Sequence, residues 1–192
     1  MGVGWPAARW ALGLVISAFM GFEGIRKKSL NRRGALAAFL VGVVSLGISL
    51  RLGLTLILFY KSSSVLTKYR TDVKRKLTGD FKEGGQRGAA QVLSCSLFGT
   101  FLAVARRILS GEGDGRVNFA AAPLGSSLLC AYLGFYACCT GDTWSSELGV
   151  LSKSPPRLIT NLFQVVPPGT NGGVSVLGTV AAAAGGLLMG TG

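Results

Sequence analysis

Long apolar stretches separated by short polar segments dominate the chain from end to end. Several of these stretches approach the roughly 20 residues that a helix needs to cross a bilayer. The pattern predicts an all-α, polytopic membrane protein with about six transmembrane helices, forming a single membrane domain over residues 1–192. The predicted spans lie near Pro6–Phe22, Gly34–Leu50, Leu52–Leu66, Gln86–Leu109, Pro123–Gly141 and Gly173–Gly190.

Two parts of this pattern leave alternatives open. The apolar stretch Gly34–Leu66 is interrupted only by Arg51, which predicts either two short helices joined by a tight turn or one bent element. An odd number of spans would change the topology. The segment Met1–Met20 has the charge and apolar core of a signal peptide, but no small-residue cleavage pattern precedes Glu23–Arg33, so we expect a retained first span.

Small residues recur inside the predicted spans. Ser17 and Gly21 are four residues apart, as are Gly186 and Gly190, and Ala181–Gly186 is continuously small. Because lipid gives helices no hydrophobic drive to associate, small residues that allow close backbone approach supply the packing. We expect these positions to be packing surfaces.

Composition supports a membrane protein with one basic face. The mean hydropathy is +0.48, 49% of residues are apolar, and the formal net charge is +12. In the six-span model, 15 of the 20 basic residues fall in three loops on one side. The basic residues left for the other side are Arg9, Arg51, Arg106, Arg107 and Arg116. The positive-inside rule places the three-loop face in the cytosol, or in the stroma of a plastid.

The residues and motifs that the sequence lacks exclude several kinds of catalytic and binding site. The sequence has no histidine, and its four cysteines lie in apolar segments without zinc-type spacing, so we interpret them as small packing residues. It contains neither a P-loop motif nor a dinucleotide-binding glycine motif in a suitable context. Any phosphate chemistry must therefore use Mg²⁺, carboxylates, basic residues and helix ends.

The longest basic loop, Lys61–Arg87, supports two interpretations. It can fix orientation and touch anionic headgroups, as juxtamembrane basic segments do. It can also hold phosphate, because glycines allow close backbone approach and a helix N-terminus behind them offers free N–H groups. The residues of this candidate phosphate site are Lys82, Gly84, Gly85, Gln86 and Arg87.

A second glycine-rich segment leads into the last predicted span. The candidate phosphate-binding residues here are Thr170, Asn171, Gly172 and Gly173, with Thr170 or Asn171 expected to cap the helix. An ordinary turn into a membrane helix has the same composition. In the six-span model both glycine-rich segments open onto the basic face.

Acidic residues follow the fifth predicted span. An ionisable residue near membrane depth, such as Asp142, is a functional-site hypothesis by default, and Asp142 and Glu147 are candidate Mg²⁺ ligands. On a helix Asp142 would share a face with Ser146, and Thr143 with Glu147. Asp142 could equally be the N-cap of a short helical turn. Downstream, the cations Lys153 and Arg157 flank a rigid proline pair and could reach a phosphate.

The sequence blocks GDTWSSELGVLSKSPPRLITN and VPPGTNGG resemble the signature of the transmembrane protein 19 family. The blocks KSSSVLTKY, KEGGQR and KKSLNRRGALAAFLVG resemble other family blocks in the same order, over nearly the whole chain. That family includes the plant chloroplast phytyl-phosphate kinase, which makes phytyl diphosphate with a nucleoside triphosphate donor. The resemblance implies an enzyme, a phosphotransferase that acts on a prenyl phosphate in an endomembrane or plastid membrane.

The resemblance also implies roles for the candidate residues. Asp142, Lys153 and Arg157 would be catalytic, Asp142 and Glu147 would hold Mg²⁺, and the two glycine-rich segments would hold phosphates of lipid and nucleotide. The implied partners are the lipid bilayer, a prenyl phosphate and a nucleotide, with no nucleic acid. A transporter, or a non-catalytic lipid-handling or scaffold protein, would use the same face without chemistry.

The sequence departs from the family pattern at two places. Ser94-Cys95 stands where relatives usually have an asparagine. Relatives also continue past the position of Gly192 with further spans and a second acidic motif. We therefore expect a C-terminally truncated form whose metal site is only partly present.

Overall fold

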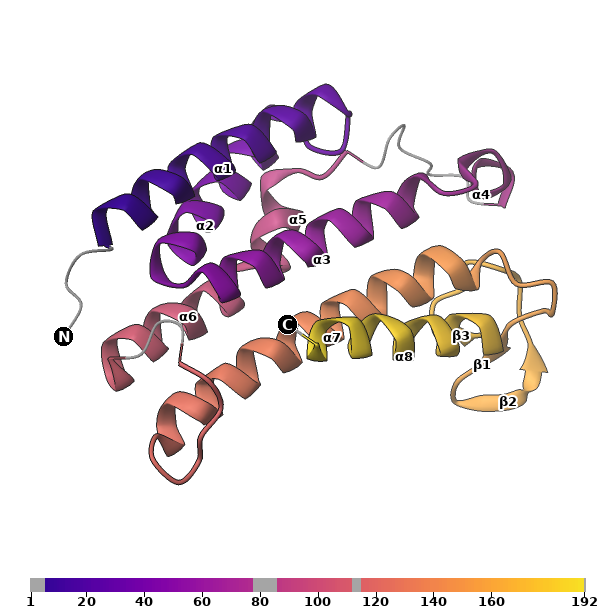
Figure 1. Cartoon of the computed structure of the whole chain (residues 1–192). Helices are drawn as coiled ribbons and strands as arrows, with labels where there is room; N and C mark the ends of the chain where they lie inside the picture. The colour runs from indigo at the N-terminus through magenta and orange to yellow at the C-terminus, as the bar shows by residue number, and fades with distance from the viewer. Residues whose placement is uncertain (1–5, 78–85, 112–114, 192) are drawn as a thin grey trace.

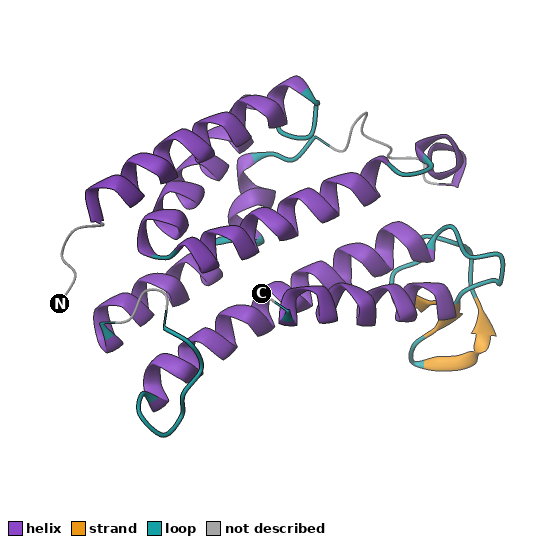
Figure 2. Cartoon of the chain, in the orientation of Figure 1, coloured by secondary structure: helices purple, strands orange, loops and turns teal. Residues whose placement is uncertain are grey.

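The computed structural model describes residues 6–77, 86–111 and 115–191, and these are mostly helical (Figure 1 and Figure 2). The helices are α1 (Pro6–Arg26), α2 (Arg32–Ile48), α3 (Leu50–Lys68), α4 (Thr71–Leu77), α5 (Ala89–Ser94), α6 (Leu97–Ser110), α7 (Pro123–Gly149) and α8 (Val176–Gly190). Three short strands, β1 (Arg157–Leu158), β2 (Asn161–Val165) and β3 (Gly173–Val174), form an antiparallel sheet in the order β2-β1-β3.

The long apolar stretch from Gly34 to Leu66 folds as two helices with a tight turn, which is the first of the two predicted alternatives. Ser49 has an extended backbone and ends α2. Its hydroxyl also accepts a hydrogen bond from the N–H of Leu52 at 3.3 Å and so caps α3. One serine therefore ends one helix and begins the next.

The predicted span over Gln86–Leu109 is not one continuous helix. The chain forms the short helix α5, breaks at Cys95 and Ser96, and continues as α6. Two serine hydroxyls donate to carbonyls one turn back, Ser94 to Ala90 at 2.8 Å and Ser96 to Val92 at 2.6 Å. Such bonds compete with the helical ladder and favour a break.

The fifth and sixth predicted spans also have different bounds. Helix α7 continues past Gly141 to Gly149, so Asp142 lies inside a helix and is not an N-cap. Helix α8 begins only at Val176 and is capped by Ser175, whose Oγ accepts from the N–H of Gly178 at 3.1 Å. The prediction that Thr170 or Asn171 caps this helix is therefore wrong.

The helices pack along one another in two groups (Figure 1). Helix α1 lies against α2, and α2 also contacts α3, α5 and α6. Helix α8 lies along α7, which in turn contacts α3 and α6. The first group is α1, α2, α3, α5 and α6, and the second is α7 and α8. Contacts of α7 with α3 and α6 hold the two groups together.

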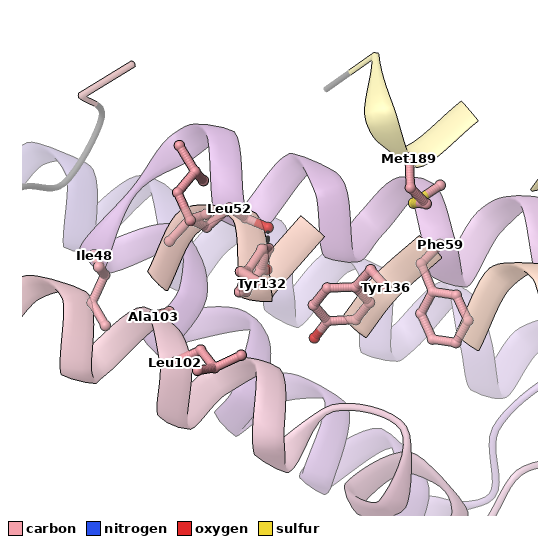
Figure 3. Close-up of a cluster of buried hydrophobic side chains, with 9 residues drawn as sticks. Ile48, Leu52, Phe59, Leu102, Ala103, Tyr132, Tyr136 and Met189 are labelled. Carbon is pink, nitrogen blue, oxygen red and sulfur yellow. Dashed lines mark hydrogen bonds between the residues drawn. The ribbon is translucent and has the colours of Figure 1, made fainter. Parts of the chain in front are cut away.

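The core lies where α3, α6, α7 and α8 meet (Figure 3). Its centre is formed by Leu52, Leu129, Tyr132, Tyr136 and Met189, each at most 1% exposed. The Tyr132 hydroxyl donates to the carbonyl of Leu52 at 2.6 Å, which satisfies a polar group inside an apolar cluster.

The expected small-residue packing is confirmed at some positions and wrong at others. On α1, Ser17 lies against Gly42 and Gly21 against Ala35. On α8 the face toward α7 is formed by Gly178, Ala181 and Gly185, whereas Gly186 and Gly190 face open space. The helix period of 3.6 residues selects one stripe of the small segment for packing.

Two helices in the described part of the chain are long and apolar enough to cross a membrane by length and composition, over Ala7–Arg26 and Pro123–Gly149. Helix α8 is apolar but shorter. The number of six spans stays a prediction. All four cysteines are free.

Candidate functional site

The connections after α1, α3 and α7 gather at one end of the helices, on the right of Figure 1. Leu30 and Arg87 form a parallel backbone bridge, and Lys68 donates to the carbonyl of Lys27 at 2.6 Å. Lys74 of α4 forms an ion pair with Glu147 of α7 at 2.6 Å. The structure thus brings together the three polar segments that the sequence predicts on one face. The ends that meet here are those of α1, α3 and α7 and the starts of α2, α5 and α8.

A cavity of about 490 Å³ opens at this end between the two helix groups. Its apolar wall comes mainly from the first three helices and includes Ile16, Met20, Leu30, Val41, Leu46, Leu56, Ile57 and Phe59. Its polar lining includes Lys74, Gln86, Arg87, Thr143, Ser146 and Glu147. The cavity therefore combines a hydrocarbon wall with two cations and one carboxylate, within the roughly 300–1,000 Å³ typical of ligand pockets.

Arg87 is one of the two cations that line this cavity. Its guanidinium donates to the hydroxyls of Ser64 at 3.0 Å and Thr67 at 3.4 Å, and it lies 6.0 Å from the centre of the Tyr60 ring. Among the described residues, no carboxylate forms an ion pair with it. Burial lowers the pKa of Arg87, while Tyr60, Cys95 and Glu147 act in the opposite direction. Because arginine stays protonated in proteins, this desolvated charge would gain from an anion.

The backbone on both sides of Arg87 is fixed by the turn between α1 and α2. The N–H of Arg87 donates to the carbonyl of Ser29 at 3.0 Å, and its carbonyl accepts from Asn31 at 3.2 Å. A Cβ atom on Gly34 would lie 2.2 Å from the carbonyl oxygen of Arg87. Only glycine at position 34 allows this approach, so the start of α2 positions Arg87.

Lys74 and Glu147 connect α4 to the end of α7 across the polar part of the cavity. The Lys74 side chain is 6% exposed, and its ammonium also donates to the carbonyl of Leu66 at 2.7 Å. A buried cation of this kind needs its partners, because an unpaired charge out of water is costly. Glu147 is thus already engaged by a cation.

Asp142 and Glu147 do not point in the same direction. They are five residues apart on α7, which separates them by about 140° around the helix axis. Glu147 lines the cavity with Thr143 and Ser146, whereas Asp142 is exposed and is not part of the lining. Among the described residues, no three His, Cys, Asp or Glu side chains cluster as metal ligands do. The two carboxylates that the sequence predicts as Mg²⁺ ligands therefore do not converge on one site, and a role for Asp142 in holding Mg²⁺ stays a prediction.

The first glycine-rich segment is only partly described. Lys82, Gly84 and Gly85 lie outside the described residues, so their phosphate-binding role stays a prediction. Gln86 is exposed and lines the cavity beside Arg87. The helix that follows, α5, has only six residues and no side-chain cap, so it offers little helix dipole to an anion.

The second glycine-rich segment forms a turn at the sheet and does not form the start of a helix. The N–H and hydroxyl of Thr170 both donate to the carbonyl of Pro167, at 3.2 and 2.8 Å. The carbonyl of Gly172 accepts from Ile159 at 2.8 Å, and Gly173 begins β3. Thr170, Asn171 and Gly172 are exposed, and Gly169 is the residue of this segment that lines the cavity.

The two cations on either side of Pro155 and Pro156, Lys153 and Arg157, lie outside the cavity. Lys153 is exposed after the end of α7, and Arg157 begins β1 and donates to the carbonyl of Leu162 at 2.8 Å. The structure brings neither of them to the cavity lining.

The sequence interpretation missed Ser64, Thr67 and Tyr60 around Arg87, and it did not single out Lys74. Ser64 and Thr67 are three residues apart in a helix of predominantly apolar character, so they share one face. A pair of hydroxyls at that spacing next to basic residues was the available signal. The spacing does not reveal that Arg87, 20 residues after Thr67, lies against this face.

Comparisons with known proteins place this fold in a family. Residues 15–192 match the family described as integral membrane protein DUF92. The chain is similar to Protein PGR of Arabidopsis thaliana, with 42% identity over 185 residues. It is also similar to uncharacterized membrane proteins of Methanocaldococcus jannaschii, 48% identical over 62 residues, and Synechocystis, 29% identical over 180 residues. No solved structure matches the chain.

The aligned part covers most of this chain but less of the relatives. It is 96% of this chain and 64% of the Arabidopsis protein, 94% and 54% for the Synechocystis protein, and 32% and 26% for the archaeal one. The family match agrees with the resemblance to the transmembrane protein 19 family, and it makes the bilayer a partner of this protein. The chain belongs to the integral membrane protein DUF92 family.

Proposed function

We propose that this protein binds a prenyl phosphate in the cavity and transfers a phosphoryl group to it from a nucleoside triphosphate. The observation that carries the proposal is the division of the cavity into an apolar wall and a cationic lining. A lipid with one hydrocarbon chain and a phosphate headgroup has the same division. The resemblance to the phytyl-phosphate kinase supports the choice of a prenyl chain.

Arg87 would hold the acceptor phosphate. It is a half-buried, protonated donor with hydroxyl partners and no ion pair to a described carboxylate, and a guanidinium matches phosphate geometry. The apolar side chains of α1 to α3 would take the hydrocarbon tail and remove it from water. Lys74 lines the same cavity and would contribute charge, once part of its bonding to Glu147 is given up.

Transfer would follow the usual course of phosphoryl chemistry. An oxygen of the acceptor phosphate bonds to the γ-phosphorus, the bond from that phosphorus to the bridging oxygen breaks, and nucleoside diphosphate leaves. Mg²⁺ bound with the nucleotide would supply positive charge during transfer, and Asp142, exposed next to the cavity-lining Thr143, would hold it. Since Lys153 and Arg157 lie outside the cavity, we give them no role in holding the acceptor.

The test uses the full chain in lipid nanodiscs with Mg²⁺, labelled nucleoside triphosphate and phytyl phosphate. We expect labelled phytyl diphosphate from the wild type, and a loss of about 100-fold or more in Asp142→Asn with binding of phytyl phosphate retained. Asp72→Asn, which changes an exposed carboxylate on α4, is the control. Full turnover in Asp142→Asn, or no nucleotide-dependent product from the wild type, would refute the proposal.

A lipid-handling role without chemistry is the second candidate. It is favoured by the absence of a carboxylate cluster among the described residues and by the engagement of Glu147 with Lys74. The same cavity would then release its lipid unchanged. Movement of phytyl phosphate between the leaflets of liposomes in the absence of nucleotide would support this candidate over the kinase.

A further inference from the structure

The hairpin formed by β1 and β2 exposes large apolar side chains far from the cavity lining. Phe163 is 93% exposed, Ile159 63%, Leu162 57% and Val165 53%. Successive residues of a strand point to opposite faces, so Leu162 and Phe163 make both faces of β2 apolar. A strand that is half-buried on a protein has one apolar face, and this strand is exposed at all five positions.

The tip of the hairpin is apolar as well. Leu158 and Asn161 pair at the end of the two strands, which leaves Ile159 and Thr160 as a two-residue turn. Ile159 in this turn is 63% exposed, so the tip presents a large apolar side chain that is not buried in the protein.

The charges around the hairpin have one sign. From Leu148 to Gly192 the sequence has no aspartate or glutamate, and its only charged side chains are Lys153 and Arg157. Both are exposed, and Arg157 lies in the hairpin itself. Cations beside an apolar tip complement a surface of acidic lipid headgroups.

The backbone of the hairpin sets its depth. Strand β2 is the outer strand of the sheet, and on its backbone the carbonyl of Leu162 accepts from the Arg157 guanidinium at 2.8 Å and the N–H of Phe163 donates to Asn161 Oδ1 at 3.2 Å. An open strand edge that carries a guanidinium is excluded from the hydrocarbon core. The apolar side chains need hydrocarbon while the edge needs water or headgroups, and the bilayer interface supplies both.

We infer that the β1–β2 hairpin is an interfacial anchor that inserts its apolar side chains into a leaflet containing acidic lipids. Helix α8 begins beside the sheet (Figure 1), and its Val176 and Val180 are exposed as well. Because the chain belongs to an integral membrane family, a bilayer is available to these apolar side chains. The anchor would fix the end of α7 and the start of α8 at the interface. This inference is independent of any catalytic activity.

The test places a photoreactive side chain at the tip. Phe163→p-benzoylphenylalanine keeps an aromatic side chain at an exposed position, and Asp72→p-benzoylphenylalanine on α4 is the matched exposed control. Both full-length variants are put into vesicles of phosphatidylcholine with or without phosphatidylglycerol, irradiated and digested. Mass spectrometry then identifies the crosslinked partner.

We expect lipid adducts at position 163 to exceed those at position 72 several-fold, and to increase when phosphatidylglycerol is present. Adding Lys153→Gln and Arg157→Gln should remove that dependence on acidic lipid. Adducts of position 163 to peptides of this chain or of a second copy, or equal lipid labelling at both positions, would overturn the inference. Retained thermal stability of each variant shows that the fold is intact.

Discussion

One buried and one half-buried arginine lie at opposite ends of the helical bundle, and their surroundings differ. Arg106 on α6 is 1% exposed, and its guanidinium donates to the carbonyls of Gly125 at 3.0 Å and Gly115 at 2.9 Å. Arg87, at the opposite end, donates to two hydroxyls and lines a cavity. Backbone carbonyls surround the first charge, while open space adjoins the second.

The difference separates a structural cation from a candidate ligand-binding one. Carbonyl oxygens that receive a buried guanidinium satisfy it within the protein, so Arg106 ties the segment before α7 to α6. Hydroxyls satisfy a guanidinium less strongly than an anion does, because charge-assisted bonds between ions are the stronger ones. Four substitutions test this contrast, from the largest expected effect to the smallest.

Replacing Arg106 should cost stability without changing lipid binding. Arg106→Ala leaves one buried and one half-buried carbonyl without their charged donor, and we expect the free energy of unfolding to fall by about 3 kcal/mol. Thermal unfolding in detergent measures it, with Arg107→Ala, an exposed neighbour, as control. A loss of phytyl phosphate binding larger than the loss of stability would contradict the contrast.

Gly34→Ala should disturb the position of Arg87 through the backbone. The new Cβ would lie 2.2 Å from the carbonyl oxygen of Arg87, and overpacking of this kind typically costs about 2 kcal/mol. Both stability and phytyl phosphate affinity should fall. Gly186→Ala on α8, where the new Cβ meets nothing within 4 Å outside its own helix backbone, should leave affinity unchanged and not lower stability, and equal behaviour of the two variants would contradict the proposed positioning.

Arg87→Gln should have the opposite effect to that expected for Arg106→Ala, because it should lower the affinity for the lipid phosphate. We expect affinity for phytyl phosphate to fall about 30-fold, equivalent to about 2 kcal/mol, because a neutral amide replaces a half-buried guanidinium. Affinity for phytol, which lacks the phosphate, should stay the same. Equilibrium binding of both lipids in nanodiscs measures this, and an equal loss for phytol would assign Arg87 to the fold and not to the headgroup.

Ser64→Ala should have the smallest effect. It removes one hydrogen bond that orients Arg87, and we expect about a fivefold loss of phytyl phosphate affinity, or about 1 kcal/mol. Ser62→Ala is the matched control, because the Ser62 hydroxyl donates to the carbonyl of Phe59 and does not contact Arg87. If both variants bind alike, Ser64 does not position the guanidinium.

Much of the fold was predictable because hydrophobicity acts locally along the chain. The apolar stretches became α1, α2, α3, α7 and α8, and the tight turn, one of the two alternatives predicted for Gly34–Leu66, lies at Ser49 and not at Arg51, where the sequence pattern is interrupted. The break inside Gln86–Leu109 was missed, because serine side chains that bond back to the helix backbone look the same in sequence as serines that face a neighbour.

The candidate site was predictable only in part. Arg87, Gln86 and Glu147 were named from the sequence and do line the cavity. Thr170 and Asn171 were named from a glycine-rich composition that in fact serves a turn next to β3. Asp142 and Glu147 were paired by proximity in sequence, and the continuation of α7 past Gly141 turned them apart.

By itself, the sequence determined that this protein belongs in a membrane, that most of its basic residues gather in three segments, and which family it resembles. These properties depend on composition and short-range pattern. Only the tertiary structure decided that Arg87 lies on the hydroxyls of α3, that Lys74 pairs with Glu147, and that an apolar cavity adjoins them. Such contacts join residues 20 to 73 positions apart, and their geometry is fixed by how helices pack and not by local pattern.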